Sequence, residues 1–146
     1  MKLRELLTEL ADKPYEILIS DHSANSSWYG FETETGLEYK IVFNYKDDAV
    51  NVTFAMISSG SFDDSLNGQA NSQSLRIMST VMFALRDVLS RKPDIRQIVF
   101  AGRTIDNSRI RLYSRIAKNI GRYIPGWSFE NEQRQGEHVI FSCIKI

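Results

Sequence analysis

The chain has 146 residues, no net charge, 42% hydrophobic residues and 25% charged residues, which is typical of one globular domain and excludes two. A single cysteine, Cys143, excludes an internal disulfide, and the isolated His22 and His138 add no ligand set for a structural zinc. We therefore expect no bound metal. No apolar run is long enough for a membrane span or a cleavable signal peptide, so we also expect no insertion into a membrane.

The first third of the chain is predicted to form one short helix and then an antiparallel meander. Leucines at helical intervals between Lys2 and Leu10 predict an amphipathic helix, which Pro14 ends. Aromatic and β-branched residues then dominate four runs, which are typical of strands. These runs are residues 15–19, 28–34, 37–45 and 49–57.

A polar, glycine-containing stretch over residues 58–73 separates the meander from the rest and is long enough to be a functional loop. The spacing of apolar residues predicts a helix from Ser74 to Arg91 with Leu85 on its buried face. The β-branched run from Ile95 to Gly102 predicts a buried strand.

The last part of the chain is predicted to form a two-faced helix and a hairpin. Asp106, Asn107 or Ser108 is expected to cap the helix, and Gly121 and Pro125 are expected to end it. The sequences WSFE and EHVIFSCIKI predict two strands joined by a turn over NEQRQG, the second apolar enough to lie inside a sheet.

Together these elements predict an α+β domain over residues 1–146, with helices packed on a central, mostly antiparallel twisted sheet. A strand-helix-strand crossover is expected over residues 48–102. The order resembles the acyltransferase fold of the GNAT superfamily, without the strand that precedes its first helix. The segment from Asp106 to Gly121 is similar to that family's pattern N-x-x-A-I-x-L-Y-x-x-x-G-F, with Ile110, Leu112 and Tyr113 in register.

The resemblance implies acetyl-CoA as a substrate and N-acetyltransferase activity. It places Asp106 at a position that contacts coenzyme A and Tyr113 at a position that protonates the departing thiolate, while the carboxylate that accepts the amine's proton is not placed. The family's pyrophosphate turn, [QR]-x-x-G-x-[GA], is matched by Gly68 and Ala70, but Ser65 stands where the basic or amide residue belongs.

Two residues of this segment have both a functional and a structural interpretation. Arg109 falls on the apolar side of its helix, where it either clamps a phosphate or carboxylate of a ligand, a phosphate if the ligand is acetyl-CoA, or bonds loop carbonyls or Asp106. Tyr113 lies on the same side, where a core tyrosine is the alternative to a proton donor.

The balanced total charge hides a basic segment, because residues 74–125 carry eleven bases and three acids. Four of the bases recur three to four residues apart on one helix face. They are Arg111, Arg115, Lys118 and Arg122. This ridge predicts contact with an acidic protein surface or nucleic acid, unless it only keeps the helix solvated and pairs with acids of the same or a neighbouring copy.

The chain also resembles small tailed-phage proteins of unassigned function in MKLRELL, NGQANSQSLRIMSTVM and IVFAG. This implies a phage-encoded protein in the host bacterial cytoplasm or the virion. The favoured hypothesis is a non-catalytic protein without a cofactor that binds a macromolecular partner, as a virion component or an inhibitor of a host factor. Acetyl-CoA-dependent N-acetyltransferase activity and nucleic-acid binding through the basic helix are the alternatives, and a homo-oligomer stays open.

Overall fold

The computed structural model describes residues 13–57 and 72–146. The expected first helix, Gly68 and Ala70 lie outside the described residues. The described strands are β1 (Ile19–His22), β2 (Ser26–Glu32), β3 (Glu38–Lys46), β4 (Ala49–Met56), β5 (Gln97–Arg103), β6 (Trp127–Gln135) and β7 (His138–Lys145). The described helices are α2 (Ser72–Arg91), α3 (Asn107–Lys118) and α4 (Ile120–Tyr123).

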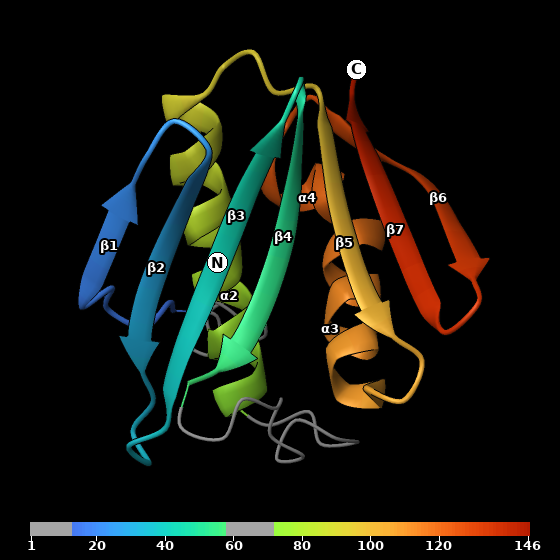
Figure 1. The fold of residues 1–146 in the computed structure, drawn as a ribbon. Coiled ribbons are helices and arrows are strands. Elements are labelled where there is room, and N and C mark those ends of the chain that lie inside the picture. The colour runs from blue at the N-terminus through green and yellow to red at the C-terminus, as the bar shows by residue number, and fades with distance from the viewer. Residues whose placement is uncertain (1–12, 58–71) are drawn as a thin grey trace, which may run out of the picture.

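The strands form one sheet in the order β1-β2-β3-β4-β5-β7-β6 (Figure 1). Neighbouring strands are antiparallel except β4 and β5, which run parallel because α2 crosses over between them. The predicted α+β class, the crossover and the inner position of the last strand are therefore confirmed. Four strands precede α2, and β6 is the edge strand at the other side of the sheet.

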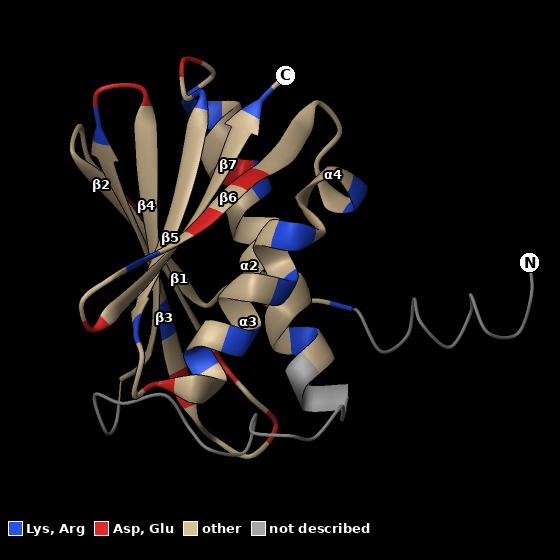
Figure 2. Cartoon of the chain, turned by 90° about the vertical axis from the view of Figure 1, so that its right-hand side faces the viewer, with Lys and Arg blue, Asp and Glu red and all other residues tan. Residues whose placement is uncertain are grey.

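The helices α2 and α3 pack on the same face of the sheet (Figures 1 and 2). Alternate strand residues point toward them, so Ile41, Phe54 and Phe100 are completely buried. From the helices, the predicted apolar faces bury Leu85 and Ile116 in the same core. Within the described residues, no helix is long and apolar enough to cross a membrane.

The predicted strand over residues 15–19 is wrong for most of its length, because β1 begins only at Ile19. Tyr15 donates its backbone N–H to the Thr80 hydroxyl on α2, at 2.8 Å, instead of to a neighbouring strand. The helix α2 also begins at Ser72, slightly earlier than expected.

The predicted end of the last helix is also wrong in detail. The helix α3 stops at Lys118, and Gly121 lies inside the following short helix α4 rather than ending α3. A Cβ at Gly121 would lie 2.9 Å from the Trp127 carbonyl oxygen, so this glycine permits close contact with β6.

The polar stretch NEQRQG is strand rather than turn for most of its length. It continues β6 to Gln135, where Gln135 pairs with His138, and only Gly136, with φ of 61°, makes the turn with Glu137. An edge strand tolerates polar residues on both faces, which explains why alternating hydrophobicity did not reveal it.

The position of Leu85 allows a direct test of the α2 packing. Its side chain is completely buried, whereas that of its neighbour Arg86 is exposed. We expect Leu85→Ala to lower the free energy of unfolding by about 2 to 5 kcal/mol, because it removes buried methyl groups and leaves a cavity. Urea unfolding of this variant and of Arg86→Ala measures the difference. A loss below about 0.5 kcal/mol for Leu85→Ala, the range of surface substitutions, would contradict the packing.

Candidate functional site

The two central strands separate at their carboxyl ends. β4 and β5 pair from Ala49 with Gln97 to Val52 with Phe100, after which β4 continues beside β3 and β5 continues beside β7 (Figure 1). The carboxyl ends of parallel strands are where α/β proteins commonly bind ligands. The backbone of β4 beyond Val52 therefore has polar groups that β5 does not satisfy.

Tyr113 of α3 meets β4 at this separation. Its hydroxyl oxygen accepts a hydrogen bond of 2.8 Å from the Phe54 backbone N–H, and its ring lies 5.5 Å from that of Phe100. Tyr113 is completely buried. Within residues 13–57 and 72–146, no acceptor is found for the proton of this hydroxyl. Tyr113 is thus a core tyrosine whose hydroxyl faces β4, and its role as a proton donor stays a prediction.

Burial raises the pKa of the Tyr113 hydroxyl to about 12, against the hydrogen bond from the Phe54 N–H, which favours the ionised form. The hydroxyl is therefore neutral at physiological pH and keeps a proton that it can donate. The sequence pattern indicates Tyr113 but not Phe54, because a backbone N–H leaves no signal in the sequence.

Gly102 of β5 allows α3 to lie this close to the sheet. A Cβ at Gly102 would come within 3.2 Å of the Ile110 side chain and 3.7 Å of the Tyr113 ring. A larger residue here would push α3 away from β5. Gly102 is thus a second residue of the site whose role the sequence did not reveal.

Asp106 and Arg109 lie at the start of α3, near Tyr113. The Arg109 guanidinium and the Asp106 carboxylate form an ion pair at 3.3 Å, with side chains 16% and 32% exposed. Their charges act in opposite directions on the Tyr113 pKa, which Arg109 lowers and Asp106 raises. Asp106 occupies the N-cap position of α3 but makes no capping hydrogen bond through its side chain. The structure thus shows the structural pairing expected for Arg109 and brings both residues beside Tyr113.

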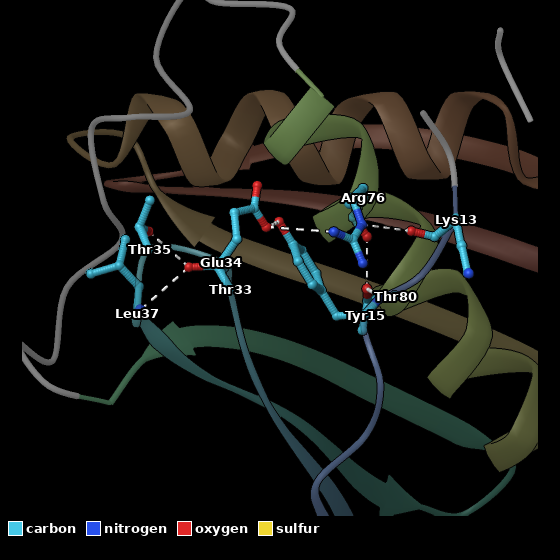
Figure 3. Close-up of polar contacts among 8 residues, drawn as sticks. All are labelled: Lys13, Tyr15, Thr33, Glu34, Thr35, Leu37, Arg76 and Thr80. Atoms are coloured by element: carbon cyan, nitrogen blue, oxygen red, sulfur yellow. Dashed lines mark hydrogen bonds and ion pairs between the residues drawn. The ribbon is translucent and has the colours of Figure 1, made fainter. Parts of the chain in front are cut away.

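A cluster around Arg76 fixes the beginning of α2 at the same end of the sheet (Figure 3). The Arg76 guanidinium stacks on the Tyr15 ring at 3.9 Å, donates to the Lys13 carbonyl at 3.0 Å and lies 3.5 Å from the Glu34 carboxylate. The Tyr15 hydroxyl donates to the same carboxylate at 2.5 Å. This cluster ties the turn between β2 and β3 to the second turn of α2.

The Glu34 carboxylate gives this cluster a pH dependence. The Tyr15 hydroxyl, its strongest partner, holds the pKa of Glu34 below its ordinary value. A lowered pKa in the folded state adds stability above the pKa of the unfolded state, and this stability is lost as the pH falls through the folded pKa.

We therefore expect Glu34→Gln to be less stable than the wild type at neutral pH, by about 1 kcal/mol or less because the site is half exposed. The difference should vanish at acidic pH. Urea unfolding at several pH values measures it, with the exposed Glu32→Gln as the matched control. An equal effect of both variants would show that the cluster does not act as described.

The predicted basic ridge is present on the surface. Arg111, Arg115 and Lys118 of α3 and Arg122 of α4 are all exposed, and Figure 2 shows Lys and Arg along these helices. Lys118 forms an ion pair with Glu132 of β6 at 3.4 Å. The ridge lies on the outer side of α3, whereas Tyr113 lies on its buried side.

No family model matches the chain, and no curated protein is similar to it. Solved structures similar to it include an acetyltransferase of Salmonella typhimurium that modifies the N-terminal serine of a protein of the 50S ribosomal subunit. That structure has a TM-score of 0.49 and 17% identity, covering 84% of this chain and 65% of its own. A ribosomal-protein alanine acetyltransferase from Vibrio fischeri has a TM-score of 0.48 and 10% identity, over 82% and 62%.

A spermidine N-acetyltransferase chimera from Vibrio cholerae has a TM-score of 0.47 and 11% identity, over 85% of this chain and 70% of its own. These three neighbours are acetyltransferases. At TM-scores below 0.5 they carry no argument about this chain, and the functional proposal rests on the strand separation and Tyr113.

Proposed function

We propose that this chain is an acetyl-CoA-dependent N-acetyltransferase. The observation that carries the proposal is the Phe54 N–H facing the buried Tyr113 hydroxyl where β4 and β5 separate. A backbone donor and a neutral side-chain acid are thereby held 2.8 Å apart inside the protein.

These two groups fit the chemistry of an acyl thioester. Acetyl-CoA supplies an activated acetyl group, whose transfer to an amine forms a carbon-nitrogen bond and breaks a carbon-sulfur bond. The amine releases a proton to solvent water, and the departing thiolate needs a proton. The Phe54 N–H, fixed by the sheet, donates to the Tyr113 hydroxyl oxygen and so holds the proton donor in one position. The Tyr113 hydroxyl, kept neutral by burial, can supply the proton as a general acid.

The same observation favours the enzyme over the non-catalytic binding protein that the sequence analysis preferred. The Tyr113 hydroxyl lies where the parallel strands β4 and β5 separate, and the carboxyl ends of parallel strands are where α/β proteins commonly bind ligands. The phage origin and the virion or host partner stay predictions. So do the expected contacts of Gly68, Ala70, Asp106 and Arg109 with acetyl-CoA.

Binding and thiol release test this proposal separately. Isothermal titration with acetyl-CoA and with CoA should show micromolar affinity, which Arg109→Ala weakens if this residue contacts a phosphate. Release of free CoA thiol should appear in the presence of a panel of primary amines. No heat and no thermal shift at millimolar acetyl-CoA would overturn the proposal.

A further inference from the structure

The helices α3 and α4 present an unusual concentration of positive charge. Residues 107–123 contain five bases and no acid. Arg109 of this set is paired with Asp106 and mostly buried. The other four form the exposed ridge. The ridge is thus a separate feature of α3 that the proposed acetyl transfer does not use.

The part of the ridge on α3 is regular. Arg111, Arg115 and Lys118 follow each other at intervals of four and three residues, so their charges recur about every 4.5 to 6 Å along the α3 axis, and Arg122 follows on α4. Phosphates along a nucleic-acid strand are spaced on a similar scale, about 3.4 Å of axis per nucleotide in a duplex. Three of the four residues are arginines, whose planar guanidinium groups bind phosphate oxygens through paired hydrogen bonds.

The ridge lacks the apolar residues that a protein interface needs. Interfaces between proteins are centred on buried aromatic or aliphatic anchors, whereas those with nucleic acid are polar and positively charged. The large exposed apolar side chains of the described residues all lie outside α3 and α4. They are Leu18, Ile19, Ile57, Phe83, Ile105, Ile144 and Ile146.

The ion pair that the described residues form with this ridge, at Lys118, is weak. Lys118 pairs with Glu132, but the two side chains are 49% and 34% exposed, so the pair contributes about 1 kcal/mol or less. A phosphate can therefore replace Glu132 at small cost.

We propose that the exposed ridge of α3 and α4 binds the sugar-phosphate backbone of nucleic acid. The binding is independent of base sequence, because the four basic side chains of the ridge contact phosphates, and contacts to phosphates carry no sequence information. This activity goes beyond acetyl transfer and does not depend on it.

Fluorescence anisotropy with a labelled single-stranded RNA and a labelled DNA duplex of equal length tests the proposal. The logarithm of affinity should fall with the logarithm of salt concentration, by about 0.9 per neutralised phosphate for the duplex and about 0.7 for the single strand. The relative affinities of the two probes identify the preferred nucleic acid.

The double variant Arg115→Gln, Lys118→Gln should bind about tenfold more weakly or worse and reduce the duplex salt slope by about two, since two phosphate contacts are lost. The matched control, Lys46→Gln with Arg134→Gln, removes the same charge from exposed strand positions elsewhere. Circular dichroism and thermal melting of both variants confirm that the fold is intact.

Three results would overturn the proposal. The first is an equal loss of affinity in the control variant, which would assign binding to net charge. The second is absence of binding to either probe at low salt. The third is equally tight binding of a polyglutamate peptide at the same salt, which would make the ridge a surface for acidic proteins.

Discussion

Replacing Tyr113 with Phe should lower the turnover of acetyl transfer by about 10²-fold or more, because a positioned general acid contributes about 10² to 10⁴ to such a step. Steady-state release of CoA thiol, with acetyl-CoA and an accepted amine, measures this loss. The affinity for acetyl-CoA should change much less, since the change removes one hydroxyl from a buried ring. The effect should therefore appear in kcat rather than in KM for the donor.

The same substitution removes the acceptor of the Phe54 N–H, which costs about 1 to 3 kcal/mol of stability when such a group stays buried. Urea unfolding must therefore accompany the kinetics. Tyr45→Phe is the matched control, because the Tyr45 hydroxyl also makes a hydrogen bond, to Ser27 at 2.6 Å, far along the sheet from the strand separation. Turnover within threefold of the wild type in Tyr113→Phe would remove the tyrosine from the mechanism.

The pH dependence of the rate adds a second criterion for Tyr113. Because burial raises its pKa to about 12, the tyrosine stays protonated well above neutral pH. The rate should therefore not fall through ionisation of this group below about pH 11. A decline with an apparent pKa near 10, the ordinary value for tyrosine, while circular dichroism shows an intact fold, would indicate an exposed hydroxyl instead.

Alkaline pH should unfold the protein over a narrow range. Burial raises the pKa of the Cys143 thiol from 9.0 to about 12 and that of the Tyr113 hydroxyl from 10.0 to about 12. Between these values the unfolded chain loses protons that the folded chain retains, so stability falls as the pH rises. A pKa difference of one unit between the folded and unfolded states corresponds to about 1.4 kcal/mol of stability. By pH 12 the free energy of unfolding therefore falls by about 4 kcal/mol through Cys143 and about 3 kcal/mol through Tyr113.

Losses of this size approach the whole stability of an ordinary domain. Urea unfolding from pH 7 to pH 11 follows the decline. Cys143→Ala should make the decline shallower from pH 9 upward, because the thiol no longer titrates in the unfolded chain. The free energy of unfolding of Cys143→Ala at pH 7 serves as the reference for its own pH curve, because the packing lost with the thiol does not depend on pH. A curve parallel to that of the wild type would show that Cys143 is not buried as described.

Much of the fold follows from patterns that the sequence carries locally. The apolar spacing around Leu85 and Ile116 predicted which faces of α2 and α3 are buried, and both residues are completely buried. The strand at residues 138–145 was predicted to lie inside the sheet, and it lies between β5 and β6. These predictions succeed because periodicity reports burial directly.

Predictions failed where contacts between distant segments decide the backbone. Tyr15 leaves the expected strand because its N–H bonds Thr80, which is 65 residues away in the chain. Gly121 was read as a helix end, but the approach of the Trp127 carbonyl explains why glycine is needed there. A local sequence pattern around Tyr15 or Gly121 does not include the distant residue, Thr80 or Trp127, that each one contacts.

The sequence by itself determined the α+β class, the two-faced helix with its exposed basic ridge, and Tyr113 as a candidate proton donor. Only the tertiary structure decided that Tyr113 faces the Phe54 N–H, that Arg109 pairs with Asp106 beside it, and that the ridge is free of exposed apolar side chains. The physical reason is that side-chain type and spacing act through local periodicity. The separation of β4 from β5 depends instead on which strands pair, and that is fixed by the packing of the whole chain.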